Sequence, residues 1–210
     1  SPEAIARHHD MKIVYTPIHG TGVTVVPPTL KAFGFTNIIH VPEQDVVSGD
    51  FPTVVSPNPE EPAALAMAVE KAKETDAELV MASDPDADRV GAAVKNNEGE
   101  WVLLNGNQTC ALLVYYIVRR WSELGKLHGR EYIVKTIVTT ELVARIAESF
   151  GVKHFECLTG FKYIGQQILK EETTGKGTYM FGMEESYGCL AGTHARDKDA
   201  VVAVMCLCEV

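Results

Sequence analysis

The chain has 210 residues, of which 46% are hydrophobic and 22% charged, and this suffices for one large or two small globular cores. Its formal net charge of −9 disfavours nucleic acid and anionic membrane as main partners, and its apolar runs are too short to span a bilayer. The five cysteines form no Cys-x-x-Cys pair, which favours reduced thiols and a cytoplasmic location over a disulfide framework or a zinc site.

Strand-like and helical segments alternate through the first half of the chain. Apolar runs predict strands over residues 11–15, 37–41, 78–82 and 90–94. A helix is predicted over residues 22–33, where Pro27 and Pro28 permit only a short or kinked form. A second helix, over residues 62–75, begins with proline, and a turn follows at residues 96–99.

The second half repeats this order. Strands are predicted over residues 131–137, 153–157 and 178–181, and helices over residues 107–121, 140–150, 162–172 and 198–210. Each half runs strand, helix, strand, helix, strand, and then places an acidic loop. The pattern predicts an α/β protein of two similar α/β/α domains, residues 1–102 and 103–210, each with a mixed, mostly parallel sheet flanked by helices. Such sheets bind ligands beyond the carboxyl ends of their strands, where both acidic loops fall.

The first acidic loop carries the strongest chemical signal. Asp84, Asp86 and Asp88 alternate in a loop between two apolar segments. Three carboxylates so close repel one another unless a cation lies among them, and hard oxygen ligands favour magnesium or calcium. The loop therefore predicts a divalent-metal site. A solvated acidic turn is the alternative, because Asp and Pro are common in exposed turns.

Two other aspartate motifs fit this loop less well. An EF-hand needs Gly at its sixth position and Glu at its twelfth, where this chain has Arg89 and Lys95. An aspartyl-phosphate phosphatase uses an Asp-x-Asp pair, but a third Asp and the adjacent Arg89 suit a cup that holds an external phosphate. Arg89 could pair with that phosphate or neutralise the loop's own charge.

The second acidic loop predicts a hydrogen-bonding site. Glu184, Glu185 and Ser186 lie between Gly182 and Gly188, so acceptors and one hydroxyl stand on a permissive backbone. This composition suits binding of neighbouring sugar hydroxyls. An ordinary acidic turn is the alternative.

Three further segments contain candidate residues. Thr159 and Gly160 lie where a strand meets a helix and could face an anion, although Thr159 could equally be a plain N-cap. Lys198 lies between two aspartates at another helix start, a pattern that fits a surface lysine in local ion pairs. His19 lies in a Gly-rich turn that matches no phosphate-binding pattern, and we interpret it as structural, with a possible role in orienting the metal loop.

Four segments resemble one enzyme family in the same order. Asp84-Pro-Asp-Ala-Asp-Arg89 resembles the metal-binding loop of the α-D-phosphohexomutases, the family of phosphoglucomutases and phosphomannomutases. Phe181-Gly-Met-Glu-Glu-Ser-Tyr-Gly188 is similar to that family's sugar-binding loop, and Thr159-Gly-Phe-Lys162 and Arg196-Asp-Lys-Asp199 resemble two further active-site segments. The resemblance implies that residues 1–102 are domain II and residues 103–210 domain III of four. Domains I and IV of the same polypeptide would then be partners of this chain.

The resemblance also implies a reaction. It is the interconversion of glucose 1-phosphate and glucose 6-phosphate by a phosphoserine enzyme, with glucose 1,6-bisphosphate as intermediate. Mg²⁺ would be held by Asp84, Asp86 and Asp88. The phosphosugar would be bound by Thr159, Gly160, Glu184, Ser186 and Lys198, with Arg89 and Lys198 in catalytic roles.

The nucleophilic serine implied by the resemblance is not found in this sequence. It belongs to a Ser-His-Asn-Pro-like loop, and Ser56-Pro-Asn-Pro59 lacks the histidine and the family position. We therefore expect the chain alone to have no appreciable mutase activity. The Glu-Glu-Ser-Tyr-Gly form with Phe161 resembles the phosphoglucomutase branch of the family more than the phosphomannomutases, and this resemblance implies glucose phosphates as substrates. Phosphomannomutase or phosphopentomutase activity, and a non-catalytic Mg²⁺-dependent sugar-phosphate binding module, are the alternatives.

Overall fold

A computed structural model describes residues 2–210, which divide into two compact domains. The N-domain extends to Leu104 and includes Leu207–Glu209, and the C-domain comprises Asn105–Cys206 with Val210. Within residues 2–210, none of the helices combines the length and the apolarity that crossing a membrane requires.

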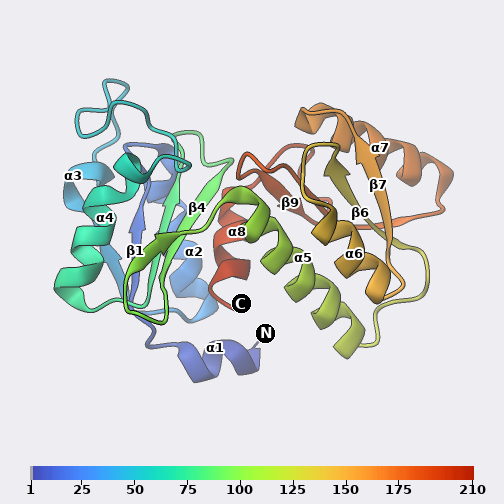
Figure 1. The fold of residues 1–210 in the computed structure, drawn as a ribbon, viewed down its shortest axis with the longest axis horizontal. Helices are drawn as coiled ribbons and strands as arrows, with labels where there is room; N and C mark the ends of the chain where they lie inside the picture. Colours follow the sequence, from blue (N-terminus) through green and yellow to red (C-terminus); the bar gives the residue numbers. More distant parts are fainter. Residues whose placement is uncertain (1) are drawn as a thin grey trace. The chain divides into compact units, whose positions relative to one another are not determined.

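The N-domain contains a five-stranded sheet in the order β2-β1-β3-β4-β5. Its strands are β1 (Ile13–Thr16), β2 (Ile38–His40), β3 (Leu79–Ser83), β4 (Val90–Lys95) and β5 (Trp101–Leu103). Strand β1 runs parallel to β2 and β3, whereas β4 and β5 are antiparallel to their neighbours. The helical elements are α1 (Pro2–His8), η1 (Thr21–Thr24), α2 (Val26–Phe33), α3 (Pro42–Asp45) and α4 (Pro62–Thr75). Figure 1 shows α2 and α4 on opposite faces of this sheet.

Small side chains let α4 pack closely on the N-domain sheet. Its buried face, which includes Leu65 and Ala68, lies against Val14 and Val80 of the central strands. The helix predicted over residues 22–33 is instead a 3₁₀ turn followed by α2. Its prolines occupy the first turn of α2, where the missing N–H groups need no partner within the helix.

The C-domain repeats this arrangement with four strands in the order β7-β6-β8-β9. They are β6 (Glu131–Thr136), β7 (Lys153–Cys157), β8 (Thr178–Met183) and β9 (Cys189–Ala191), of which only β9 is antiparallel to its neighbour. The helices are α5 (Gly106–Glu123), α6 (Glu141–Ser149), α7 (Phe161–Thr174) and α8 (Ala200–Leu207). In Figure 1, α7 covers one face of this sheet and α5 and α6 cover the other.

The two mixed sheets flanked by helices confirm the predicted fold class. In both domains the third strand of the repeat, β3 or β8, is followed by an acidic loop and then by an antiparallel strand. The sequence patterns missed α1, α3 and the short strands β5 and β9. Strands of three residues give only a weak pattern, and of the three strands of this length among residues 2–210 only β2 was predicted.

Candidate functional site

The first acidic loop joins β3 to β4 and is held firmly at its base. Ser83, the last residue of β3, pairs with Val90, the first residue of β4. The Ser83 hydroxyl also makes a 2.7 Å hydrogen bond with the phenol of Tyr15, whose pKa is raised chiefly by burial. The loop therefore begins and ends on neighbouring buried strands.

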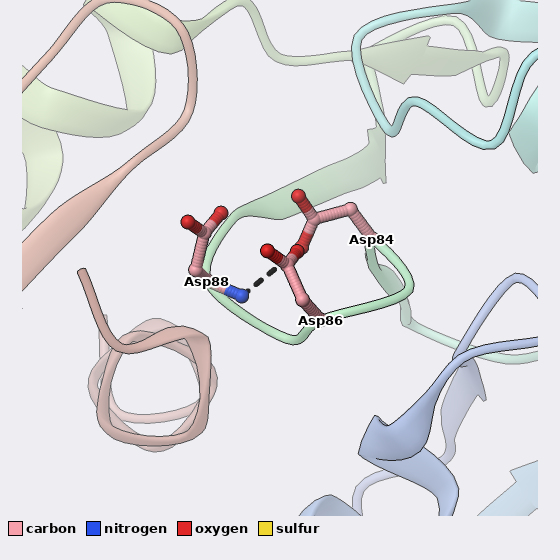
Figure 2. A group of neighbouring side chains, drawn as sticks. All are labelled: Asp84, Asp86 and Asp88. Carbon is pink, nitrogen blue, oxygen red and sulfur yellow. Dashed lines mark hydrogen bonds between the residues drawn. The ribbon is translucent and has the colours of Figure 1, made fainter. Parts of the chain in front are cut away.

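The three predicted metal ligands come together at this loop. Figure 2 shows Asp84, Asp86 and Asp88 projecting from one turn with their carboxylates near one another, and one oxygen of each lies within 4.8 Å of the others. The turn is shaped by Asp84 Oδ1, which accepts the backbone N–H groups of Asp88 and Arg89 at 3.0 Å each. Ala87, which lies between Asp86 and Asp88, adopts a left-handed φ of 58°.

The electrostatics of the loop fit a bound cation. Burial, followed by repulsion from Asp88 and Asp86, raises the pKa of Asp84 to about 7 against the pull of its hydrogen bond from the Arg89 amide. Oxygens on opposite sides of one Mg²⁺ are about 4.2 Å apart, because each lies about 2.1 Å from the ion. The separations of up to 4.8 Å among the three aspartate oxygens are close to this span. The donor set contains only hard oxygens, so the residues fit magnesium, and calcium as well.

Arg89 shares its charge between the loop and a neighbouring glutamate. Its Nε lies 3.7 Å from both Asp84 Oδ2 and Asp88 Oδ1, and its Nη1 lies 3.4 Å from Glu60 Oε1. These are long contacts on a partly exposed side chain. The guanidinium is therefore available to an anion placed beside the loop.

The second acidic loop joins β8 to β9 and brings two predicted residues together. The Glu184 side chain is only 8% exposed, and its Oε1 accepts the Gly160 N–H at 2.9 Å. Gly160 has a φ of 117°, a conformation that other residues rarely adopt. The Glu184 N–H donates to the Gly188 carbonyl at 2.9 Å, and Ser186 is half-buried between them.

Glu185 is held by two threonines, Thr136 at the end of β6 and Thr139 in the loop that follows it. Thr136 and Thr139 each donate a hydroxyl hydrogen bond to Glu185 Oε2, at 3.2 and 3.3 Å, and their hydroxyl oxygens lie 2.8 Å apart. Both threonines are buried. The position of the Glu185 carboxylate therefore depends on the conformation of this loop.

The loop after β6 also contacts Lys135, a fully buried cation in β6. Its Nζ lies 2.8 Å from carboxylate oxygens of Glu141 and Glu156 and donates to the Thr139 carbonyl at 3.1 Å. Burial alone would lower the pKa of Lys135, but the hydrogen bonds and charges of the two glutamates outweigh it and raise the pKa. The lysine stays charged and joins β6, α6 and β7.

Lys198 lies across the second acidic loop. Its side chain is 14% exposed, and its stem passes so close to Gly188 that a Cβ at that position would overlap it. Its Nζ lies 2.9 Å from Asp197 Oδ1 and 5.4 Å from the centre of the Phe161 ring. Thr159 is exposed and is not the N-cap of α7, because Gly160 holds that position without a side-chain cap.

Sequence reasoning missed several of these contacts. A lysine in the otherwise apolar run Tyr132-Ile-Val-Lys135 is a signal, because lysine is seldom fully buried without a partner. Glu60 and the two threonines carry no such mark. Their roles depend on contacts with residues 29 to 49 positions away, which a local pattern does not reveal.

Two family models match the chain over nearly its whole length. Residues 3–99 match the model described as phosphoglucomutase/phosphomannomutase, alpha/beta/alpha domain II, and residues 105–210 match domain III of the same family. The chain belongs to the phosphoglucomutase/phosphomannomutase family.

Relatives within this family carry several activity names. A probable phosphoribomutase of Schizosaccharomyces pombe is 41% identical over 93% of the chain, and a phosphoglucomutase of Staphylococcus saprophyticus is 37% identical over 93%. The chain spans only 33% and 35% of these two relatives.

Solved structures of the family share the fold. A putative phosphomannomutase from Thermus thermophilus superimposes with a TM-score of 0.75 at 24% identity, covering 99% of this chain and 45% of that one. An N-acetylphosphoglucosamine mutase from Aspergillus fumigatus, solved with GlcNAc-6P and magnesium, gives a TM-score of 0.65 at 13% identity, covering 99% of this chain and 48% of that one.

Proposed function

We propose that the chain is the metal- and sugar-binding part of a phosphohexomutase that interconverts glucose 1-phosphate and glucose 6-phosphate through glucose 1,6-bisphosphate. The observation that carries the proposal is the gathering of Asp84, Asp86 and Asp88 on one turn, in a chain of this family. Because the chain spans about a third of its relatives' length, the turnover is proposed for the longer polypeptide and not for these residues alone.

The chain's residues would divide the work between the two loops. Asp84, Asp86 and Asp88 would hold Mg²⁺, which supplies positive charge to a transferring phosphoryl group. Arg89 would add a second cation beside them. In the first transfer the P–O bond to the donor oxygen breaks and a P–O bond to a sugar hydroxyl forms, while the proton of that hydroxyl passes to a base. In the second transfer the P–O bond at the other phosphorylated position of the sugar breaks, the phosphoryl group returns to the donor oxygen, and the sugar oxygen that is released takes up a proton.

The C-domain loop would hold the sugar. Glu184 and Ser186 would accept and donate hydrogen bonds to neighbouring ring hydroxyls, and Thr159 and Gly160 would line the same site. Lys198 would bring an ammonium to the substrate phosphate, since its stem already crosses the loop at Gly188. Glu184 is preorganised for this role by its hydrogen bond from Gly160.

Metal binding is the first test of the proposal. Titration calorimetry of the chain with Mg²⁺ and Mn²⁺ should give one site, which Asp86→Asn weakens by about tenfold or more, because it removes one charged ligand. Asp50→Asn, in an exposed loop, should bind Mg²⁺ and Mn²⁺ with the affinity of the unsubstituted chain. Equal affinities for both variants would contradict the assignment.

Sugar binding and turnover form the second test. Ligand-observed NMR with glucose 1-phosphate should show binding that Glu184→Gln reduces and Glu98→Gln, in an exposed turn, leaves unchanged. The chain alone should show no appreciable mutase turnover. Turnover equal to that of a full-length family member would overturn this part of the proposal.

A phosphopentomutase is the second candidate, because the relative in Schizosaccharomyces pombe is named a probable phosphoribomutase. Parallel titrations with glucose 1-phosphate, mannose 1-phosphate and ribose 1-phosphate separate the candidates. We expect the glucose compound to bind most tightly. Tighter binding of the ribose compound would select the second candidate.

A further inference from the structure

A partly buried chain of hydrogen bonds connects residues 16–53 of the N-domain, near the first acidic loop. Thr16 Oγ1 donates to Gln44 Oε1 at 2.7 Å, and Gln44 Nε2 lies 3.2 Å from Thr53 Oγ1. The Thr53 hydroxyl lies 2.8 Å from His19 Nε2, and His19 Nδ1 lies 2.8 Å from the Val46 carbonyl.

The partners of His19 select one tautomer of its neutral ring. The Val46 carbonyl only accepts, so Nδ1 carries a proton. Thr53 accepts from the Gln44 amide and has one proton of its own, which it can donate to an unprotonated His19 Nε2. A second proton on Nε2 would leave the Thr53 hydroxyl proton without this acceptor. The Nδ1–H tautomer therefore satisfies both ring nitrogens.

This ring anchors a strained turn. Ile18 and His19 both have positive φ angles, 46° and 62°, although neither is glycine and Ile18 is β-branched. The His19 N–H donates to the Gln44 carbonyl at 2.9 Å, and the His19 carbonyl accepts from Ser48 at 3.1 Å. Backbone and ring together hold His19 against residues 44–53, and such support is what keeps unfavourable angles in place.

The strained turn presents the next two residues to the metal loop. Gly20 lies so close to Pro85 that a Cβ at Gly20 would overlap the Pro85 backbone. Thr21 donates both its N–H and its hydroxyl to the Pro85 carbonyl, at 2.8 and 3.1 Å. Pro85 stands between Asp84 and Asp86, so these contacts fix the backbone that connects two of the three carboxylates.

We propose that His19, acting through Gly20 and Pro85, is a positioning residue that sets the spacing of the Asp84–Asp88 carboxylates for a divalent cation. The inference rests on the proposed function, because it assumes that this loop binds the cation. The alternative is that the network only anchors the loop of residues 46–53. These two roles predict different behaviour when one hydroxyl is removed.

Thr53→Val removes the hydroxyl that His19 accepts and keeps the side-chain shape. We expect it to weaken Mn²⁺ binding by about tenfold, the lower end of the range for residues behind metal ligands. Thr53→Ser keeps the hydroxyl and should restore the affinity. Thr75→Val, which removes the hydroxyl bond to Lys71 in α4, is the matched control and should bind Mn²⁺ normally.

Calorimetry with Mn²⁺ and thermal unfolding of the metal-free chain separate the outcomes. If the unsubstituted chain binds Mn²⁺ and Thr53→Val binds it equally well, the positioning role is wrong while the metal site stands. If the unsubstituted chain does not bind Mn²⁺, the metal site and the positioning role both fail. A loss of affinity in Thr53→Val that exceeds the loss in Thr75→Val, with similar melting temperatures, supports the role.

Nitrogen-15 NMR of the imidazole tests the network without any metal. His19 should show a protonated Nδ1 and an unprotonated Nε2 at pH 7, and Thr53→Val should shift the Nε2 resonance. The opposite tautomer, or an imidazolium, would overturn the hydrogen-bond direction on which the inference depends.

Discussion

Individual residues at the first acidic loop carry an electrostatic cost that a cation would relieve. Asp84 is almost fully buried yet lies beside Asp86 and Asp88, and its Oδ1 accepts two backbone N–H groups. Arg89 offsets part of this charge only over long distances. The loop therefore has more negative charge than Arg89 neutralises, and a bound cation would supply the remaining positive charge.

The raised pKa of Asp84 predicts that the metal-free chain loses stability as pH rises. With a pKa of about 7 when folded and its ordinary value near 4 when unfolded, the carboxyl binds its proton more tightly in the folded state. Its contribution is complete below about pH 4 and is lost as pH rises through about 7. Urea unfolding in EDTA should show a decrease of up to about 4 kcal/mol across this window.

Asparagine does not titrate, so the unfolding free energy of Asp84→Asn should lack this decrease between about pH 4 and 7. Saturating Mg²⁺ should also reverse the trend, because the cation competes with the proton and binds better as pH rises. An unchanged slope in Asp84→Asn would mean that other groups cause the pH dependence.

Gly20→Ala tests the close contact between Gly20 and Pro85 of the first acidic loop, because it adds only one side-chain carbon. The new Cβ would displace the Pro85 backbone, so we expect a loss of about 1–3 kcal/mol in unfolding free energy and a weaker Mn²⁺ affinity. Gly49→Ala is the matched control, because nothing lies within 4 Å of its added Cβ. Similar affinities for the two variants would contradict the importance of this contact.

Elements rather than single contacts organise the second acidic loop. Lys135 in β6 holds α6 and β7 through Glu141 and Glu156, and the end of β6 and the loop after it direct two hydroxyls to Glu185. Glu184 is held from the start of α7 through Gly160. The two adjacent glutamates are thus positioned by different parts of one sheet.

Lys135→Met should loosen this arrangement. Breaking a fully buried ion pair costs about 3–5 kcal/mol, but Glu141 and Glu156 are partly exposed and can be solvated, so we expect about 1–3 kcal/mol. Urea unfolding measures the loss, and NMR titration with glucose 1-phosphate should show weaker binding. Lys170→Met, on the exposed side of α7, should change neither quantity.

At the scale of the whole molecule, the two domains repeat one topology but carry different loops. Each has its own sheet and core, so a ligand should stabilise chiefly the domain whose loop it binds.

Hydrogen exchange followed by mass spectrometry can check this localisation. Mg²⁺ should slow exchange in β1 and β3, and glucose 1-phosphate without metal should slow exchange in β6 and β8. Asp86→Asn should abolish only the first effect. Equal protection of both domains by Mg²⁺ alone would contradict the separation.

The sequence predicted the architecture well where its signals were local. Alternating apolar runs and prolines located the parallel strands and the main helices, and charge repulsion marked the aspartate loop. Features that depend on distant contacts were beyond this reasoning. Nothing local predicts left-handed angles at Ile18 and His19, because their stability comes from residues 44–53. The burial of Lys135 likewise depends on α6 and β7.

Both acidic loops are the connections of antiparallel hairpins, closed by Ser83 with Val90 and by Met183 with Cys189. Because both ends of each loop are fixed by strand pairing, the loop tolerates a substitution more readily than an insertion or a deletion. One inserted residue would change the direction of every acidic side chain after it relative to those before it. The number of residues in each hairpin connection is therefore as much a part of the chemistry as the acids themselves.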